Sequence, residues 1–126
     1  MDWQDIALIA AGMIGSTVAI IHGVLVRRLM IRPLQHGFLA DERTAPPVKK
    51  LVPLLLDFSA YNWLVGGIAL IVAAIWLGQE QKAVAAVLVG SSYLYAAIGN
   101  FWGTRGRHFG WMLHAAALGL ILFGIL

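Results

Sequence analysis

The chain has no cysteine and little charge. The absence of cysteine excludes disulfides, thiolate metal sites and thiol redox chemistry. Charged residues make up 12% of the 126 residues and hydrophobic residues 60%, whereas a soluble domain carries about 25% charged and about 45–50% apolar residues. Because so few charges cannot cover a water-facing surface, we expect most of the surface to face lipid. A chain of this length is expected to form one domain.

The beginning of the chain has no basic residue. The stretch "MDWQDIALIAAG" is acidic, whereas a signal peptide begins with a basic region. We therefore expect the first apolar segment to remain in the mature protein.

Four apolar segments are long enough to cross a bilayer, which requires about 20 mostly apolar residues. Backbone polar groups in hydrocarbon must be paired within their own segment, so each segment is expected to be a helix. The sequence therefore predicts an all-α fold, an integral membrane bundle of four transmembrane helices in a single domain, 1–126. The predicted spans are residues 6–26, 51–77, 83–102 and 109–126.

Proline sets two of the predicted boundaries. Proline has no backbone N–H and its ring clashes with the preceding turn of a helix. We therefore expect the first helix to end by Pro33. We expect Pro53 to lie in the first turn of the second helix, where the missing N–H costs nothing.

Basic residues are distributed unevenly between the connections. Residues 27–50 contain six Lys or Arg and residues 103–108 contain two, whereas the connection 78–82 contains only Lys82. Basic connections stay in the cytoplasm. We therefore predict that 27–50 is a basic cytoplasmic connection and that both termini lie outside, on the periplasmic or extracellular face. The predicted location is the plasma membrane, in a bacterium the inner membrane.

Small residues recur every four positions along the first span and form a continuous ridge. Such a ridge lets another helix approach closely. Its use in packing within the bundle and its use as a homo-oligomer contact both remain open. The residues of the ridge are Ala7, Ala11, Gly15, Ala19 and Gly23.

Polar residues of the four spans share one depth. At a rise of about 1.5 Å per residue, His22 lies roughly 7 Å inward from Arg27, and Asp57 roughly 10 Å inward from Lys50. A carboxylate inside a span needs a partner, and the expected partners of Asp57 are His22 and His114. The candidate ligand or proton site, with hydrogen bonding between helices as the structural alternative, comprises Asp57, His22, His114, Tyr61, Asn62 and Asn100.

These residues favour a transport protein with a polar pocket on the cytoplasmic side, which passes a small solute, an ion or a proton. The alternative is a non-catalytic accessory, assembly or lipid-binding subunit, because Arg27, Arg28 and Arg32 can attract anionic lipid headgroups. The net charge of +3 is small and localised, so nucleic-acid binding is not indicated.

Cofactor and enzyme chemistry have weaker support. His22 and His114 at matching depth permit a haem, and with Asp57 they permit a metal, but the sequence has no His-x-x-x-His or Glu-x-x-His pair. No nucleophile stands beside a base, so catalysis is not indicated. We therefore assign no cofactor, metal site or catalytic residue.

Overall fold

The computed structural model describes all 126 residues, which form helices and no strand. The all-α class is confirmed, with four principal helices. Three helical stretches, Trp3–Ala40, Pro46–Trp76 and Gln79–Thr104, are long and apolar enough to cross a membrane, and a shorter apolar helix follows. In chain order the elements are α1 (Trp3–Val26), η1 (Arg27–Ile31), α2 (Arg32–His36), η2 (Phe38–Ala40), α3 (Pro46–Trp76), α4 (Gln79–Thr104) and α5 (Gly110–Ile125).

The first helix does not end by Pro33, so this predicted boundary is wrong. η1 is a π-helical turn, in which the N–H of Arg32 donates to the carbonyl of Arg27, five residues back. A π turn is wider than an α turn, and it is one of the ways in which a helix accommodates an obstructed hydrogen bond. The helix therefore continues through Pro33 as α2 and ends at His36.

The second helix begins earlier than predicted. α3 starts at Pro46 rather than near residue 51, with proline in its first turn. Pro46 and Pro47 begin the helix because their fixed φ suits the first turn, where no N–H is needed. The prediction that Pro53 lies in the first turn is consequently wrong, since it lies inside α3.

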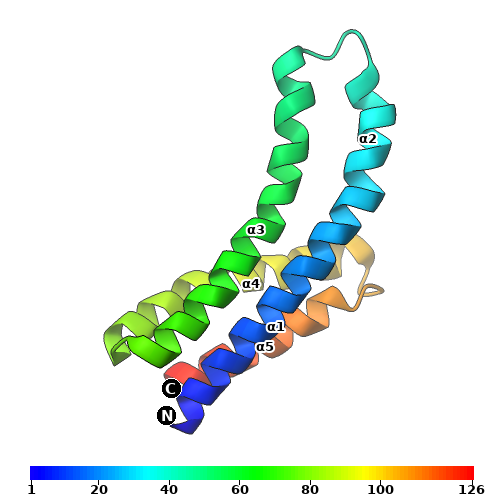
Figure 1. Cartoon of the computed structure of the whole chain (residues 1–126). Helices are drawn as coiled ribbons and strands as arrows, with labels where there is room; N and C mark the ends of the chain where they lie inside the picture. The colour runs from blue at the N-terminus through cyan, green and yellow to red at the C-terminus, as the bar shows by residue number, and fades with distance from the viewer.

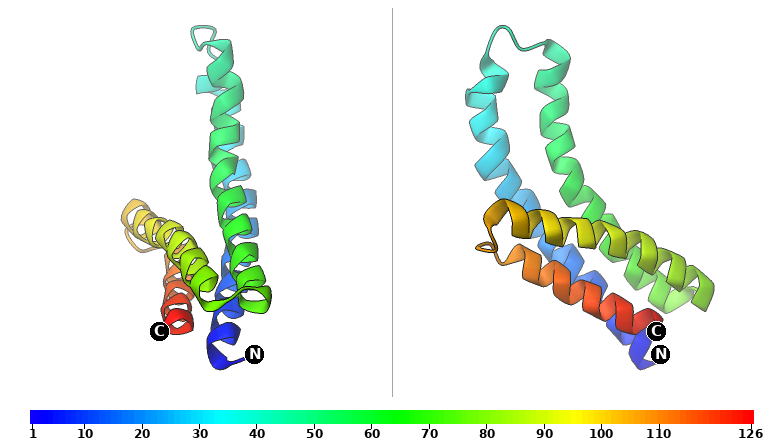
Figure 2. Two further views of the ribbon diagram at one scale, coloured as in Figure 1. Left: turned by 90° about the vertical axis from the view of Figure 1, so that its left-hand side faces the viewer. Right: turned by 180° about the vertical axis from the view of Figure 1, so that it is seen from behind.

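The helices form two hairpins that meet over part of their length. α1 packs against α3 and α5, and α4 packs against α5 and α3. Both termini lie at one end, with the turn between α3 and α4 (Figure 1). We call it the terminal end, and we call the opposite end, where Arg27 and the loop 105–109 lie, the basic end. At the basic end α1–η1–α2 and α3 continue beyond α4 and α5 (Figure 2). We call residues 29–56 the projecting hairpin.

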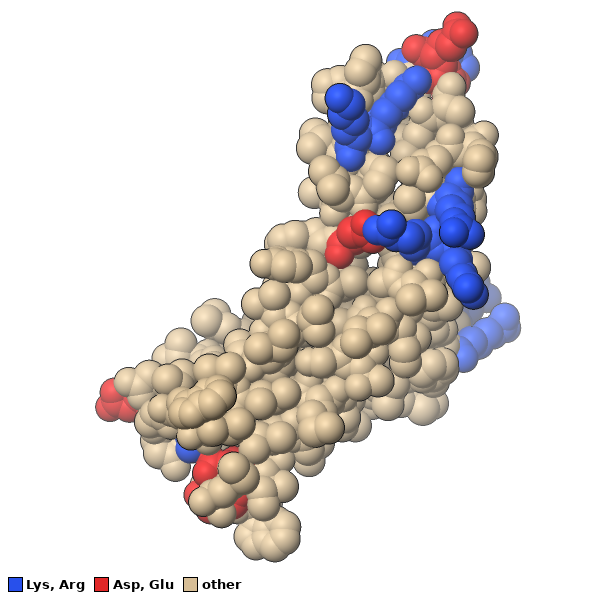
Figure 3. Space-filling view, viewed as in Figure 1, with Lys and Arg blue, Asp and Glu red and all other residues tan.

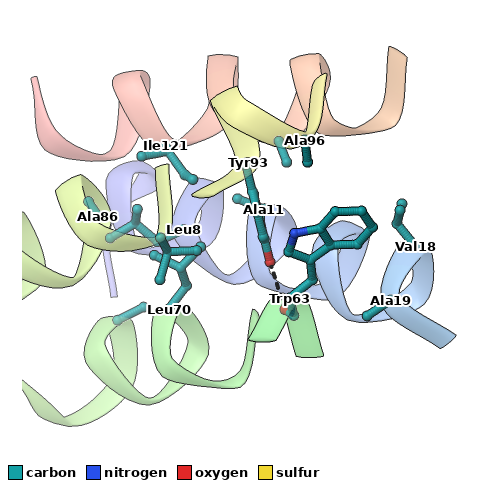
Figure 4. Packing of buried hydrophobic residues seen from close by; sticks show 13 residues of the cluster. Leu8, Ala11, Val18, Ala19, Trp63, Leu70, Ala86, Tyr93, Ala96 and Ile121 are labelled. Carbon is teal, nitrogen blue, oxygen red and sulfur yellow. Dashed lines mark hydrogen bonds between the residues drawn. The ribbon is translucent and has the colours of Figure 1, made fainter. Parts of the chain in front are cut away.

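Glycines make the close contact between α1 and the other helices. A Cβ at Gly12 would overlap the carbonyl oxygen of Gly67 on α3, and a Cβ at Gly15 would overlap the hydroxyl of Tyr93 on α4. Tyr93 is completely buried, as are Leu8 and Leu70 nearer the terminal end (Figure 4). The interior is thus filled by side chains, without a polar path in this part of the bundle.

The small-residue ridge of α1 is buried within the single chain. Ala11, Gly15 and Ala19 are buried, and a Cβ added at Gly23 would lie 3.4 Å from the Cβ of Ala60 on α3. The ridge is thus used for packing within the bundle, the first of the two alternatives that the sequence left open. A homo-oligomer contact through Ala11, Gly15, Ala19 and Gly23 stays a prediction, and it would require these residues to leave their present neighbours.

A partly buried ion pair joins two helices at the terminal end. Asp2 caps α1, because its carboxylate accepts from the N–H of Asp5 at 2.8 Å. Asp5 in turn pairs with Lys82 of α4, and their side chains are 13% and 12% exposed. This contact fastens the beginning of α1 to the beginning of α4.

Candidate functional site

Four aromatic rings from the four long helices form a continuous stack. The indole of Trp63 lies between two imidazoles, with ring centroids 4.3 Å from His22 and 4.5 Å from His114. The ring of Tyr93 follows, 5.2 Å from His114. Such offset and edge-on pairs contribute about 0.5–1.5 kcal/mol each beyond the area that they bury. The stack therefore joins α1, α3, α5 and α4 in the middle of the bundle.

Hydrogen bonds fix the two ends of this stack. The hydroxyl of Ser59 donates to the carbonyl of Leu56 at 2.9 Å and lies 2.9 Å from Nε2 of His22, which can donate to it. The hydroxyl of Tyr93 donates to the carbonyl of Trp63 at 3.2 Å. Ser59 of α3 thus positions His22, and the backbone carbonyl of Trp63 of α3 positions Tyr93.

His114 is one of two residues with buried side-chain polar atoms that have no hydrogen-bond partner, and Ser16 is the other. His114 is 0% exposed, and neither ring nitrogen makes a hydrogen bond. A buried polar group without a partner costs about 1–3 kcal/mol. His114 is therefore held by its contacts with Trp63 and Tyr93, and not by polar bonding.

A small cavity lies beside the stack at the basic end. Its volume is about 20 Å³, and its lining is mostly apolar, with polar side chains from His22, Asn100 and His108. A cavity needs at least about 10–15 Å³ to hold one water molecule. It therefore has room for one water molecule or one ion of similar size, not for an organic solute.

The loop between α4 and α5 brings His108 to this cavity. Arg105 and Gly106 both have positive φ, and the N–H of Gly106 donates to the carbonyl of Phe101 at 2.8 Å. A left-handed conformation after the last helical turn is a common way to end a helix. His108 then turns back, and its Nδ1 accepts from the N–H of Gly110 at 3.1 Å.

Asp57 lies outside the cavity. Its carboxylate accepts from the guanidinium of Arg27 at 2.8 Å, and its side chain is 33% exposed. The prediction that His22 or His114 is its partner is therefore wrong. The helix of α1 continues through Arg27, so the guanidinium reaches the carboxylate, while His22 points to Ser59.

The other candidate residues are divided. Asn100 lines the cavity with His22, as the matching depths predict. Tyr61 is 62% exposed on the outer face of α3. Asn62 donates from Nδ2 to the hydroxyl of Ser92 at 2.9 Å and so joins α3 to α4. The structure thus brings together His22, Asn100 and, behind Trp63, His114, but not Asp57, Tyr61 or Asn62.

Arginines surround the basic end. Arg27, Arg28 and Arg32 are exposed on the continuation of α1, and Arg105 and Arg107 are exposed on the loop between α4 and α5. In the space-filling view Lys and Arg side chains gather on the right-hand side about halfway up the molecule, with one acidic side chain beside them (Figure 3). We call Arg27, Arg28, Arg32, Arg105 and Arg107 the basic belt.

The geometry gives little support to a metal or haem. The chain has no group of three His, Asp or Glu residues placed to hold a metal ion. The indole of Trp63 occupies the space between His22 and His114 that a haem ligated by both would need. The donor set therefore does not fit either group.

Sequence reasoning missed Tyr93 and His108 as neighbours of the site. Ser59, which contacts His22, lies four residues before Trp63, so both fall on one face of α3. His108 reaches the cavity because Arg105 adopts a left-handed conformation. An arginine in a sequence does not predict this conformation.

Comparison with protein-family models, with curated proteins and with solved structures gave no match. The function therefore has to be argued from the geometry of the chain.

Proposed function

We propose that the protein is a small, non-catalytic membrane protein of the accessory or lipid-binding kind. Its four helices lie in the membrane, with the basic end toward the cytoplasm and both termini outside. The observation that carries the proposal is the basic belt, in which arginines of both hairpins lie at one end of the bundle. Basic residues near an anionic membrane surface contribute about 1 kcal/mol each to its binding.

The filled interior supports this proposal over transport. Tyr93, Leu8 and Leu70 are completely buried between the cavity and the terminal end. The cavity of about 20 Å³ lies on the other side of Tyr93, toward the basic end, and these side chains fill the interior beyond it. A protein that binds headgroups at one surface needs no path through the bundle.

Retention of anionic lipid tests the proposal. The protein is purified in detergent from phosphatidylglycerol-containing membranes, and the bound lipid is counted by native mass spectrometry. The double variant Arg28→Gln with Arg32→Gln is expected to retain several-fold less phosphatidylglycerol than the unchanged chain.

The matched control is Arg43→Gln. Arg43 is also exposed, but its guanidinium is already paired with Asp41 at 3.1 Å. This variant is expected to retain lipid as the unchanged chain does. Equal retention by the unchanged chain and the double variant would contradict the proposal.

Passage of a small solute, an ion or a proton remains a second candidate. It is favoured by one observation, the cavity beside the stack of His22, Trp63 and the unpartnered His114. Proton flux into proteoliposomes, measured with an interior pH dye, tests it with His114→Leu. If the stack passes protons, the unchanged chain conducts and this variant does not; no flux above that of empty vesicles removes this candidate.

A further inference from the structure

The projecting hairpin exposes large apolar side chains beyond the basic belt. Leu54 and Leu55 of α3 are 63% and 69% exposed, because they lie outside the part of α3 that α4 and α5 cover. Exposed apolar patches of this kind mark interaction surfaces. The exposed apolar residues of the hairpin are Leu29, Met30, Phe38, Val48, Leu51, Leu54 and Leu55, and Phe58 adjoins them.

The apolar residues of α3 form one face of the helix. Leu51, Leu54, Leu55 and Phe58 follow the spacing of residues that share a helical face. The same exposed face continues along α3 through Tyr61, Val65, Ile68, Val72 and Ile75. The surface that would face lipid in the span therefore runs without interruption into the hairpin, as far as Leu51.

Two levels of charge enclose this apolar region. The basic belt and Asp57 lie toward its base, and Lys49, Lys50, Asp41 and Glu42 lie toward its tip. The seven residues from Lys50 to Asp57 correspond to about 10 Å along the helix. Apolar residues flanked by long basic side chains are typical of helices that lie at the boundary between headgroups and acyl chains.

The orientation of the hairpin suits this location. The hairpin is bent away from the direction of α4 and α5 (Figures 1 and 2). Within the hairpin, the helix that begins as α1 passes through the π turn Arg27–Ile31, and α3 contains Pro53. Because α4 and α5 cross the bilayer in the proposed arrangement, the hairpin inclines toward the membrane plane.

The charge of the hairpin indicates what binds to this surface. The connection 27–50 contains six basic residues against two acidic ones. Two copies of the hairpin would repel each other, whereas an anionic leaflet attracts each of them. The charge pattern therefore favours lipid over a second copy of the chain.

We infer that the projecting hairpin docks on the anionic cytoplasmic leaflet, with Leu51, Leu54 and Leu55 at the acyl boundary and Lys49 and Lys50 among the headgroups. The inference rests on the proposed function, because it requires the basic end to face anionic lipid. It adds that the projecting hairpin is an element associated with the membrane and not a hairpin in water.

Spin labels measure the depth of the hairpin directly. The chain has no cysteine, so Leu54→Cys, Leu55→Cys and Glu42→Cys each provide one labelling site. The labelled full-length proteins are reconstituted in vesicles of phosphatidylglycerol and phosphatidylcholine. Power saturation then compares collisions with oxygen, which enters lipid, and with a nickel chelate, which stays in water.

Labels at Leu54 and Leu55 are expected to meet oxygen several-fold more than the nickel chelate, and the label at Glu42 is expected to show the reverse. Labels at Leu54 and Leu55 that meet the nickel chelate as Glu42 does would overturn the inference, since the hairpin would lie in water. Labels at those sites that meet neither reagent would also overturn it, since protein would cover them.

Vesicles of phosphatidylcholine alone test the role of charge. The oxygen preference at Leu54 is expected to fall there, and an unchanged preference would overturn the anionic part of the inference. Lipid retention by the Arg28 and Arg32 variant separates the two proposals. The expected loss of retention, together with labels in water, rejects only the docking, whereas equal retention rejects the headgroup binding.

Discussion

Gly15 is the glycine at which an added Cβ would come closest to another atom. A Cβ there would overlap the hydroxyl of Tyr93, which is completely buried and hydrogen-bonded to Trp63. Overpacking of this kind costs about 1–3 kcal/mol, which exceeds or offsets the gain of about 1 kcal/mol from replacing a helical glycine by alanine. We therefore predict that Gly15→Ala lowers the melting temperature of the detergent-solubilised protein.

The matched control is Gly99→Ala. Gly99 lies in α4, and a Cβ there would have no neighbour within 4 Å. This variant should leave the melting temperature unchanged or raise it slightly through helix propensity. A Gly15→Ala protein that melts together with the Gly99→Ala protein would show that α1 and α4 are not in the contact described.

Asp41 provides a titration at the tip of the hairpin. The guanidinium and backbone N–H of Arg43 donate to its carboxylate and hold the pKa of Asp41 below its usual value of 3.8. A lowered folded-state pKa gives a stabilising contribution that is present above the unfolded pKa and is lost as the pH falls through the folded one. Carboxyl carbon shifts in an NMR titration should therefore give a midpoint below 3.8. In Arg43→Gln the midpoint should rise, and an unchanged midpoint would mean that Arg43 does not contact the carboxylate.

At the level of helices, the pair of Arg27 and Asp57 joins α1 to α3 at the base of the projecting hairpin. Both side chains are partly exposed, and exposed pairs contribute only about 0.2–1 kcal/mol. We predict that Arg27→Asp and Asp57→Arg each speed amide hydrogen exchange in residues 27–31, because each places like charges together. The double variant should recover most of the protection. If the double variant lost as much protection as the two single variants together, the pair would not couple the helices.

The helices were predictable from hydrophobicity, and their ends were not. Long apolar segments require paired backbone groups, so the existence of four helices follows from composition. The prediction that the first helix ends at Pro33 was wrong because a π turn allows hydrogen bonding to the carbonyl one residue further back. The prediction that the second helix starts near residue 51 was wrong because Pro46 and Pro47 can begin a helix as readily as Pro53 can.

The candidate site was predictable in depth but not in direction. Counting residues from the basic ends placed His22 and Asn100 at one level, and both line the cavity. Depth says nothing of which way a side chain points, so Asp57 and Tyr61 were grouped with them although they lie outside. Rotation about each helix is decided by packing, here by the glycine contacts of α1.

At the scale of the whole molecule, the arrangement in the membrane can be tested by labelling. In cells or spheroplasts with the native orientation, an impermeant maleimide should reach Gln79→Cys from outside, because Gln79 begins α4 at the terminal end. It should reach Thr44→Cys, in the tip of the hairpin, only after the membrane is permeabilised. Labelling of Thr44→Cys in intact cells would reverse the orientation proposed from the basic residues.

The contact between α1 and α3 at Gly12 and Gly67 joins the two helices near the terminal end. The helices touch backbone to backbone there, with Ile71 beside Gly12, and they stay in contact through Gly23 with Ala60 and through Arg27 with Asp57. From Gly12, the 24 residues to His36 form an arm of about 36 Å. Because the contacts recur along this arm, a change in the tilt of α1 in the bilayer would carry the hairpin with it. A change of about 5° would displace the tip by about 3 Å, as follows from that length.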